Sequence, residues 1–174
     1  MTDKTRPENP GIRPLYDGDA EALLRFYQGL SAETVFFYDP HPGATLESMQ
    51  EVVRRAVSGQ DVARALVTES GEIVGHVSLR DIGSAEPSFG IGIADEWQNR
   101  GYGPQLTAHV LAQADARPEV HAVVLTVNKT NLRAQKLYRE FGFVVYGECD
   151  HREPGDSYRM RRPTGGHLAA DQRG

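Results

Sequence analysis

The chain is poor in cysteine and has no long apolar run. Cys149 is the only cysteine among 174 residues, which excludes an intrachain disulfide and a cysteine-based metal cluster. No stretch approaches the roughly 18 consecutive apolar residues that a membrane-spanning helix needs. Residues 1–11 contain no apolar segment typical of a secretory signal. These absences predict a cytoplasmic protein without a membrane partner.

The composition is that of a globular protein. Apolar residues make up 39% of the chain, which is enough for a buried core in a chain of this length. The formal net charge of −5 argues against a nucleic-acid partner and fits a cationic one such as an amine. We expect residues 1–10 to be a flexible lead, residues 11–162 to form one domain, and residues 163–174 to be a disordered tail.

The first third of the chain reads as one short strand and two helices. A strand is expected over 12–15, followed by a helix that Asp17 caps and Gly29 ends. Thr45 is expected to cap a further helix that ends near Gly59. The segment 30–42 stays unassigned, because an apolar cluster in it is interrupted by proline and glycine.

The rest of the chain alternates between strand and helix patterns. A hairpin around Ser70-Gly71 opens it, and a dense β-branched run over 120–127 predicts a buried strand. The expected strands are 63–69, 72–80, 88–94, 120–127, 143–150 and 157–162, and the expected helices are 104–116 and 131–141. The order β-α-α-β-β-β-α-β-α-β-β predicts an α/β fold, a mixed sheet flanked by helices on both faces.

The strongest signal is the loop before the helix expected at 104–116. It reads Gln98-Asn99-Arg100-Gly101-Tyr102-Gly103 and leads from a strand into a helix. A helix start offers free backbone N–H groups to a phosphate, and glycine lets the backbone approach closely. A tight strand-to-helix turn needs glycine in any case. The spacing matches neither the dinucleotide-binding fingerprint nor the P-loop, so the loop alone leaves both interpretations open.

Two segments together resemble a known family. Gln98-x-x-Gly101-x-Gly103 is similar to the acetyl-coenzyme A (acetyl-CoA) loop of the GNAT superfamily of N-acetyltransferases. The downstream pattern Asn131-x-x-Ala134-x-x-x-Tyr138, which closes on Phe-Gly-Phe, resembles the helix that faces the cofactor in that family. The resemblance implies a GNAT-like fold and acetyl-CoA as co-substrate.

The resemblance also implies which residues bind the cofactor. The pyrophosphate would lie on the backbone N–H groups of Asn99, Arg100, Gly101, Tyr102 and Gly103, and Arg100 would help with its charge unless it is an ordinary surface arginine. Pro104 departs from the pattern, because it supplies no N–H where serine or threonine is frequent. Asp95 and Glu96 precede the loop and would repel the phosphates, so we expect both side chains to point into solvent.

The third strand would bind the pantetheine arm. The resemblance implies that the backbone of Ile91, Gly92 and Ile93 pairs with it, and that an N–H there polarises the thioester carbonyl. The glycines at 90 and 92 could also mark only a bulge or a close packing contact.

The downstream helix would supply an amide contact and an acid. In the family pattern, Asn131 bonds the pantetheine amide and Tyr138 protonates the departing thiolate. Seven residues separate the two, so both fall on one helix face. Asn131 is equally suited to be a plain N-cap. For Tyr138 the alternative is a core tyrosine, and the motif favours the acid.

The general base is the open point. Ser88 stands where many family members carry a glutamate, and a serine could only orient a water. Other candidates are Glu86, His76, His109 and Glu148. Nothing marks Cys149 as an activated nucleophile, so direct transfer in a ternary complex is favoured over an acyl-enzyme.

These observations predict an enzyme that moves an acetyl group from acetyl-CoA to a primary amine. The acceptor would be a small molecule or a protein N-terminus or lysine, and a homodimer is a possible assembly. The alternative is a non-catalytic acyl-CoA sensor, suggested by Ser88. The acceptor would be selected by the N-terminal helices and the last strand pair, which contribute an apolar rim of Phe36, Phe37, Tyr38, His41 and Tyr158.

Overall fold

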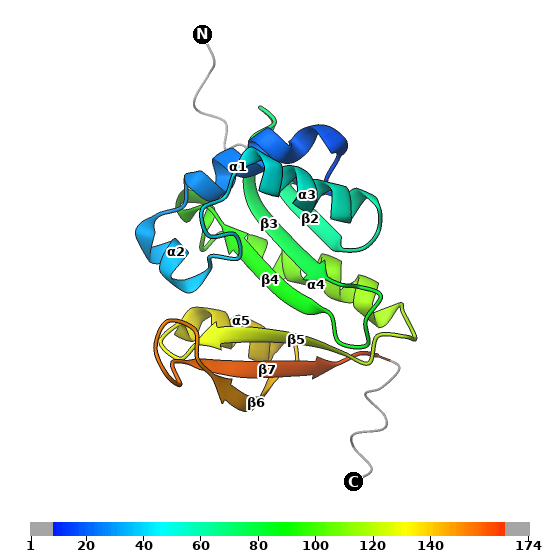
Figure 1. Cartoon of the computed structure of the whole chain (residues 1–174), viewed down its shortest axis with the longest axis vertical. Coiled ribbons are helices and arrows are strands. Elements are labelled where there is room, and N and C mark those ends of the chain that lie inside the picture. Colours follow the sequence, from blue (N-terminus) through cyan, green and yellow to red (C-terminus); the bar gives the residue numbers. More distant parts are fainter. Residues whose placement is uncertain (1–8, 166–174) are drawn as a thin grey trace.

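The computed structural model describes residues 9–165 and shows one seven-stranded mixed sheet with helices on both faces (Figure 1). The strand order is β1-β2-β3-β4-β5-β7-β6, and the β4–β5 pair is parallel while the other pairs are antiparallel. The strands are β1 Gly11–Arg13, β2 Val62–Val67, β3 Ile73–Arg80, β4 Ser88–Ile93, β5 Ala122–Asn128, β6 Val144–Cys149 and β7 Ser157–Pro163. The helices are α1 Ala20–Gln28, α2 Ala32–Phe37, α3 Leu46–Val57, α4 Tyr102–Asp115 and α5 Leu132–Glu140, with 3-10 turns η1 Asp17–Asp19 and η2 Asp95–Trp97. The predicted fold class is confirmed, and the element order agrees with the prediction except for the additional helix α2.

Two apolar clusters hold the helices to the sheet. On one face α4 and α5 pack over the middle strands, with Leu106, Val123 and Met160 almost fully buried. On the other face α1 and α3 cover β2 and β3 around Leu23 and Met49. Successive strand residues point to opposite faces, so β2 and β3 contribute to both clusters, whereas β4, β5 and β7 contribute only to the first.

The sheet is split along its middle. Strands β4 and β5 share a single pair, Ser88 with Val124, and then diverge. The edge of β4 that faces β5 is therefore left without a strand partner along most of its length. The two strands therefore splay apart.

Several boundaries differ from the sequence expectation. The unassigned segment contains α2, which begins at Ser31, whose hydroxyl accepts a hydrogen bond from the Thr34 amide. The Asp17 cap is wrong: residues 17–19 form the turn η1, and Asp19 accepts the bond from the Tyr16 amide. The Thr45 cap is confirmed: its hydroxyl accepts from the Ser48 amide, and the Ser48 hydroxyl accepts from the Thr45 amide.

The expected start of the disordered tail also needs correction. Strand β7 continues to Pro163, and Thr164 is buried, with its hydroxyl donating to the carbonyls of Val120 and His121. The Gly165 amide donates to Asp115 on α4. The rest of the predicted tail and most of the predicted lead lie outside the described residues. Within 9–165, no helix has the length and apolar character to cross a membrane.

Candidate active site

A cavity of about 1250 Å³ opens between β4 and β5. It is larger than the roughly 300–1,000 Å³ of most small-molecule sites, so it has room for a large cofactor and an acceptor together. All but one of the site residues predicted from the sequence line it. These are Ser88, Ile91, Gly92, Ile93, Gln98, Asn99, Gly101, Tyr102, Gly103, Asn131 and Tyr138.

The loop before α4 presents a row of unused backbone donors. Within the described residues, the N–H groups of Asn99 to Gly103 form no hydrogen bond. Positive φ angles at Asn99 (59°) and Gly101 (84°) turn the chain tightly into the helix. Free amides at a helix N-terminus stabilise an anion, so this end of the cavity suits the pyrophosphate.

The two loop glycines differ in whether the backbone conformation requires glycine. Gly101 holds a left-handed conformation that disfavours any Cβ. Gly103 has no such constraint, and a Cβ there would make ordinary contacts, 3.6 Å from Leu137 Cδ2 and 3.9 Å from Ile93 Cδ1. Only Gly101 is required by backbone geometry.

Gln98 links the loop to its neighbours. Its amide nitrogen donates to the Ile93 carbonyl (2.9 Å) and to Thr34 on α2 (3.2 Å), and its oxygen accepts from Arg133 (3.0 Å). The side chain therefore positions the loop, and Arg133 of α5 brings a cation to the cavity wall. No motif in the sequence pointed to Arg133.

Arg100 is the predicted site residue that does not line the cavity. Its guanidinium lies over the Trp97 ring, 5.0 Å from the ring centroid, so in this structure it is a surface arginine. Pro104 stands in the first turn of α4, where helix amides have no intrahelical acceptor and a missing N–H costs little.

The acidic pair Asp95-Glu96 was expected to face solvent. Asp95 is in addition hydrogen-bonded to the first turn of α2. Its carboxylate accepts hydrogen bonds from the amide and hydroxyl of Ser31 and from the Thr34 hydroxyl. These bonds lower the pKa of Asp95, with the Ser31 hydroxyl as the largest cause. The negative charge is thus held at the N-terminus of α2.

Tyr38 covers the glycines of β4. A Cβ at Gly92 would lie 2.6 Å from Tyr38 Cε1, and one at Gly90 would lie 3.2 Å from the Tyr38 hydroxyl oxygen. The register between β3 and β4 is regular, so these glycines allow close packing and do not form a bulge. Burial raises the pKa of Tyr38 to about 12.

Tyr138 is both a packed ring and part of the cavity wall. Its ring packs edge-on against Phe89 at 5.7 Å and lies 5.9 Å from Phe143, and the residue is 8% exposed. Burial, and then the nearby Tyr38, raise the pKa of its phenol well above the usual range. The hydroxyl stays protonated at neutral pH, which is the state of a general acid.

Asn131 caps α5. Its side-chain oxygen accepts a hydrogen bond from the Ala134 amide at 3.2 Å, and the residue also lines the cavity. The cap is present, and the contact with a pantetheine amide remains a prediction.

None of the four substitute bases named from the sequence lines the cavity. Glu86 is paired with Arg161, and Glu148 with Lys129. His109 is exposed on α4. His76 is buried under α1 with Nδ1 at 2.7 Å from the Tyr27 hydroxyl, and burial lowers its pKa to about 3.

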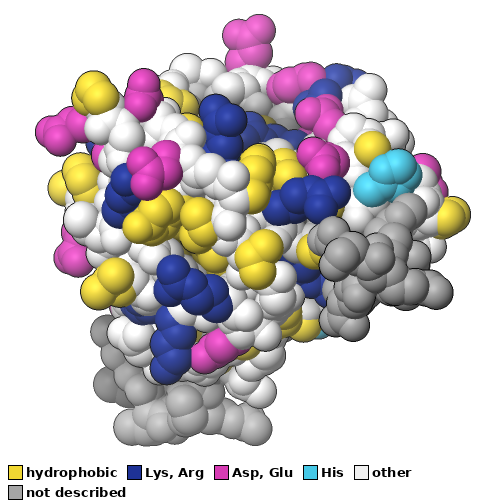
Figure 2. Space-filling model, turned by 90° about the horizontal axis from the view of Figure 1, so that it is seen from below, with side chains coloured by type: hydrophobic (Ala, Val, Ile, Leu, Met, Phe, Trp, Pro, Cys, Tyr) yellow, Lys and Arg dark blue, Asp and Glu magenta, His cyan; other side chains and the backbone are white. Residues whose placement is uncertain are grey.

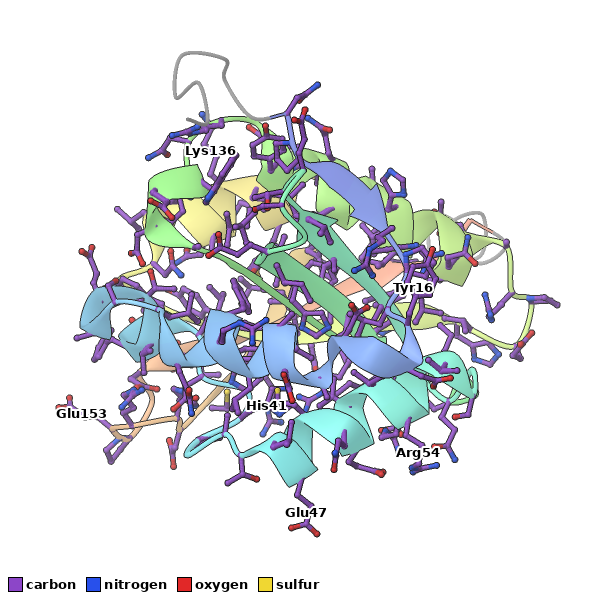
Figure 3. All side chains as sticks on the ribbon, turned by 90° about the horizontal axis from the view of Figure 1, so that it is seen from above. Tyr16, His41, Glu47, Arg54, Lys136 and Glu153 are labelled. Carbon is purple, nitrogen blue, oxygen red and sulfur yellow. The ribbon has the colours of Figure 1, made fainter. Side chains whose placement is uncertain are left out.

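His41 is a candidate general base that does line the cavity. Its ring packs edge-on against the Tyr27 ring, with 5.0 Å between the ring centroids. Burial and then the charge of Arg80 lower the pKa of His41, while Asp39 opposes them. A neutral imidazole at the cavity wall can accept a proton. In Figure 3 His41 lies inside the outline of the molecule near α1, whereas Glu47, Arg54 and Glu153 point outward.

Hydrogen bonds join the β6–β7 loop to α2. Arg152, in the β6–β7 loop, donates to the Val35 and Phe36 carbonyls at the C-terminal end of α2, and lies over the Phe36 ring. Of the expected rim, Phe37, Tyr38 and His41 line the cavity. Phe36 does not, and neither does Tyr158, whose ring meets Lys129.

Strand β6 forms one edge of the sheet and exposes apolar side chains. Val144, Val145 and Tyr146 are exposed by 61%, 42% and 54%. Figure 2, seen from below, shows hydrophobic side chains interspersed with Lys and Arg side chains in the middle of the visible face.

Comparisons with known proteins agree on one family. The model of the acetyltransferase (GNAT) domain matches residues 11–144. The L-amino acid N-acetyltransferase AaaT of Escherichia coli K12 is 29% identical over 154 residues, which cover 86% of this chain and 88% of that protein.

Solved structures share the fold. An acetyltransferase of the GNAT family from Streptococcus pneumoniae superposes with a TM-score of 0.78 at 24% identity, covering 90% of this chain and all of that one. Spermidine N-acetyltransferase from Vibrio cholerae, solved with CoA and spermine, has a TM-score of 0.72 at 20% identity, covering 91% and 98%.

Proposed function

The chain belongs to the acetyltransferase (GNAT) family and uses acetyl-CoA to acetylate an amine, and on that premise we propose how its residues divide the work. The observation that carries the proposal is the content of one cavity. It combines unpaired amides at the N-terminus of α4, an unpaired edge of β4 and the protonated phenol of Tyr138. A sensor without catalysis has no need of the phenol, so the enzyme is favoured.

The cofactor would lie along the opening between the splayed strands. The amides of Asn99 to Gly103 would hold the pyrophosphate, with Arg133 adding positive charge. The pantetheine arm would pair with the free edge of β4 at Ile91 to Ile93, much as a missing strand would. The thioester would then lie near Tyr138.

The transfer step needs a base, an oxyanion donor and an acid. The acceptor nitrogen attacks the thioester carbonyl, and an N–H of β4 stabilises the oxygen as negative charge develops. The C–N bond forms, the C–S bond breaks, and the thiolate takes the Tyr138 proton. The amine proton passes to His41, directly or through a water held by Ser88.

The test is a panel of amines incubated with acetyl-CoA and followed by release of free thiol. At least one primary amine should give thiol release that depends on both substrates, with the acetyl group recovered on nitrogen. Tight acetyl-CoA binding without transfer to any amine would favour the sensor instead.

Ser88→Ala is expected to lower kcat by less than about tenfold, because an oriented water is replaceable whereas a proton acceptor is not. Steady-state rates with saturating acetyl-CoA check this. A loss beyond about a hundredfold with unchanged cofactor affinity would make Ser88 a central catalytic group.

His41→Gln is expected to lower kcat by about ten- to a hundredfold near neutral pH, since the glutamine amide cannot accept the proton. The pKa of His41 is lowered, so the neutral, active form dominates above that pKa and is lost as pH falls through it. The acid limb of the wild-type kcat profile should therefore lie below the usual histidine range, and the variant should lack it. His109→Gln, an exposed histidine outside the cavity, is the matched control. An unchanged acid limb in His41→Gln would exclude His41 as the base.

Three further features stay proposals. The cytoplasmic location and the absence of a nucleic-acid or membrane partner rest on composition and on the net charge of −5. A homodimer is supported by the apolar exposed edge strand β6. The acceptor class is open between an amino acid, as in the E. coli relative, a polyamine, as in the V. cholerae enzyme, and a protein amine.

A further inference from the structure

Two solvent-exposed arginines on the cavity wall stand apart from all others in residues 9–165. Arg80 at the end of β3 and Arg159 on β7 line the cavity, yet neither forms a hydrogen bond, an ion pair or a ring contact there. Every other described arginine has such a partner. Their partners are acidic or amide side chains, backbone carbonyls or an aromatic ring, and the residues are Arg13, Arg25, Arg54, Arg55, Arg64, Arg100, Arg117, Arg133, Arg139, Arg152, Arg161 and Arg162.

Both arginines lie on the same face of the sheet. Arg80 pairs with Ser88 on β4, and Ser88 pairs with Val124 on β5. Val124 pairs with Arg161 on β7, and Arg159 is two residues away from Arg161. Paired residues, and residues two apart on a strand, point to the same face. The α4–α5 cluster packs against the other face, so both guanidinium groups face the acceptor side of the opening.

This end of the cavity is not the phosphate end. The free amides that suit the pyrophosphate belong to the start of α4, beyond the far end of β4, whereas Arg80 is beside Ser88, where β4 begins. The charge of Arg80 also lowers the pKa of His41, which places the arginine close to the proposed base. An unpaired guanidinium at this point suits an anionic group on the acceptor.

We propose that Arg80 and Arg159 form a carboxylate-binding subsite, and that the acceptor is an α-amino acid. The inference rests on the proposed function of the site. In an α-amino acid one carbon separates the carboxylate from the amine. A carboxylate held at Arg80 therefore brings the amine to Ser88 and His41. Arginine suits this role because its planar fork matches both carboxylate oxygens.

The acidic groups of the cavity favour the opposite acceptor. Glu33, Asp39 and Glu140 also line it, and a polyamine would use such carboxylates. Asp39 is compatible with both acceptors, because the ammonium group of a zwitterion also needs a partner. Arg80 and Arg159 favour the amino acid over the polyamine, since an unpaired guanidinium repels a polycation and attracts a carboxylate.

The experiment compares acceptors that differ only at the carboxylate. Alanine, methionine and phenylalanine are each assayed beside their amides and their decarboxylated amines, with spermidine as the polycation. For the preferred side chain, the wild type should show a kcat/KM at least about tenfold higher for the amino acid than for its amide. Equal values, or a preference for spermidine, would overturn the subsite.

Variants assign the preference to the two arginines. Assayed at a pH well above the pKa of His41, so that the base stays neutral without the Arg80 charge, Arg80→Gln and Arg159→Gln should each lower kcat/KM for the amino acid by about ten- to a hundredfold, mainly through KM, with little change for the amide. Arg80→Lys should recover part of the loss. Arg64→Gln, on β2 and outside the cavity, is the matched control and should behave as wild type.

Two readouts separate this proposal from its competitors. Acetyl-CoA affinity, measured by calorimetry, should stay unchanged in both glutamine variants. A fall in affinity would mean that the arginines bind a cofactor phosphate, which overturns the acceptor subsite. Binding of the N-acetyl amino acid to the CoA-loaded protein tests the subsite without turnover. An absence of thiol release with any amine would contradict the proposed function itself.

Discussion

Gly101→Val is expected to raise the Kd for acetyl-CoA by about a hundredfold or more, because several backbone hydrogen bonds to phosphate depend on the loop geometry. Gly101 has a φ of 84°, a left-handed conformation that a β-branched residue strongly disfavours. The substitution forces the loop to rearrange where the free amides of Asn99 to Gly103 converge. Calorimetry with acetyl-CoA measures the change.

A matched variant separates loop geometry from general destabilisation. Gly59, which follows α3 outside the cavity, has a φ of 79° and, like Gly101, nothing within 4 Å of an added Cβ. Gly59→Val should therefore carry a similar strain, visible as a lower melting temperature, and bind acetyl-CoA as wild type does. If folded Gly101→Val also binds as wild type, the loop is not the phosphate site.

Tyr138→Phe is expected to lower kcat by about ten- to a thousandfold, with the lower part of that range favoured because a thiolate is already a tolerable leaving group. Charge develops on the sulfur only as the thioester breaks, so the phenol stabilises the transition state and not the bound substrate. The acetyl-CoA Kd should hardly change. Rates under chemistry-limited conditions provide the measurement.

Thermal stability is the control for this prediction, because Tyr138 also packs in the core. The Tyr138 ring contacts Phe89 and Phe143, and phenylalanine keeps both contacts. Thermal stability should therefore stay close to that of the wild type. Phe89→Leu, in contact with the same ring, should lower stability through lost packing while retaining the phenol. An unchanged kcat in Tyr138→Phe would show that Tyr138 serves only the core.

The element order could be predicted because each element carries its own local signal. The Thr45 cap, the β-branched run of β5 and the glycine that ends α1 are decided within a few residues. Helix α2 escaped prediction because it is six residues long and its N-terminus is held by Asp95, which is far away in the sequence. A short helix of this kind depends on tertiary contacts more than on its own sequence.

Some site residues could likewise be predicted from local sequence motifs, whereas others depend on tertiary packing. The loop glycines, Asn131 and Tyr138 could be placed from motifs, because a turn and a helix face are local properties of the chain. Arg100 and the four substitute bases could not be judged, since whether a side chain faces a cavity depends on packing. His41 belonged to an expected apolar rim, and only its packing beside Tyr27 and Arg80 makes it a candidate base.

The sequence by itself determined the fold class, the tight turn at Gly101 and the helix that carries Tyr138, because these follow from periodicity and backbone preference over short distances. The tertiary structure alone decided the opening between β4 and β5, the contact of Tyr38 with Gly92, and the shared cavity of Arg80 and Arg159. Three further strands and two α-helices lie between Arg80 and Arg159 along the chain. The physical reason is that strand pairing and side-chain packing join residues whose separation in the sequence carries no local signal.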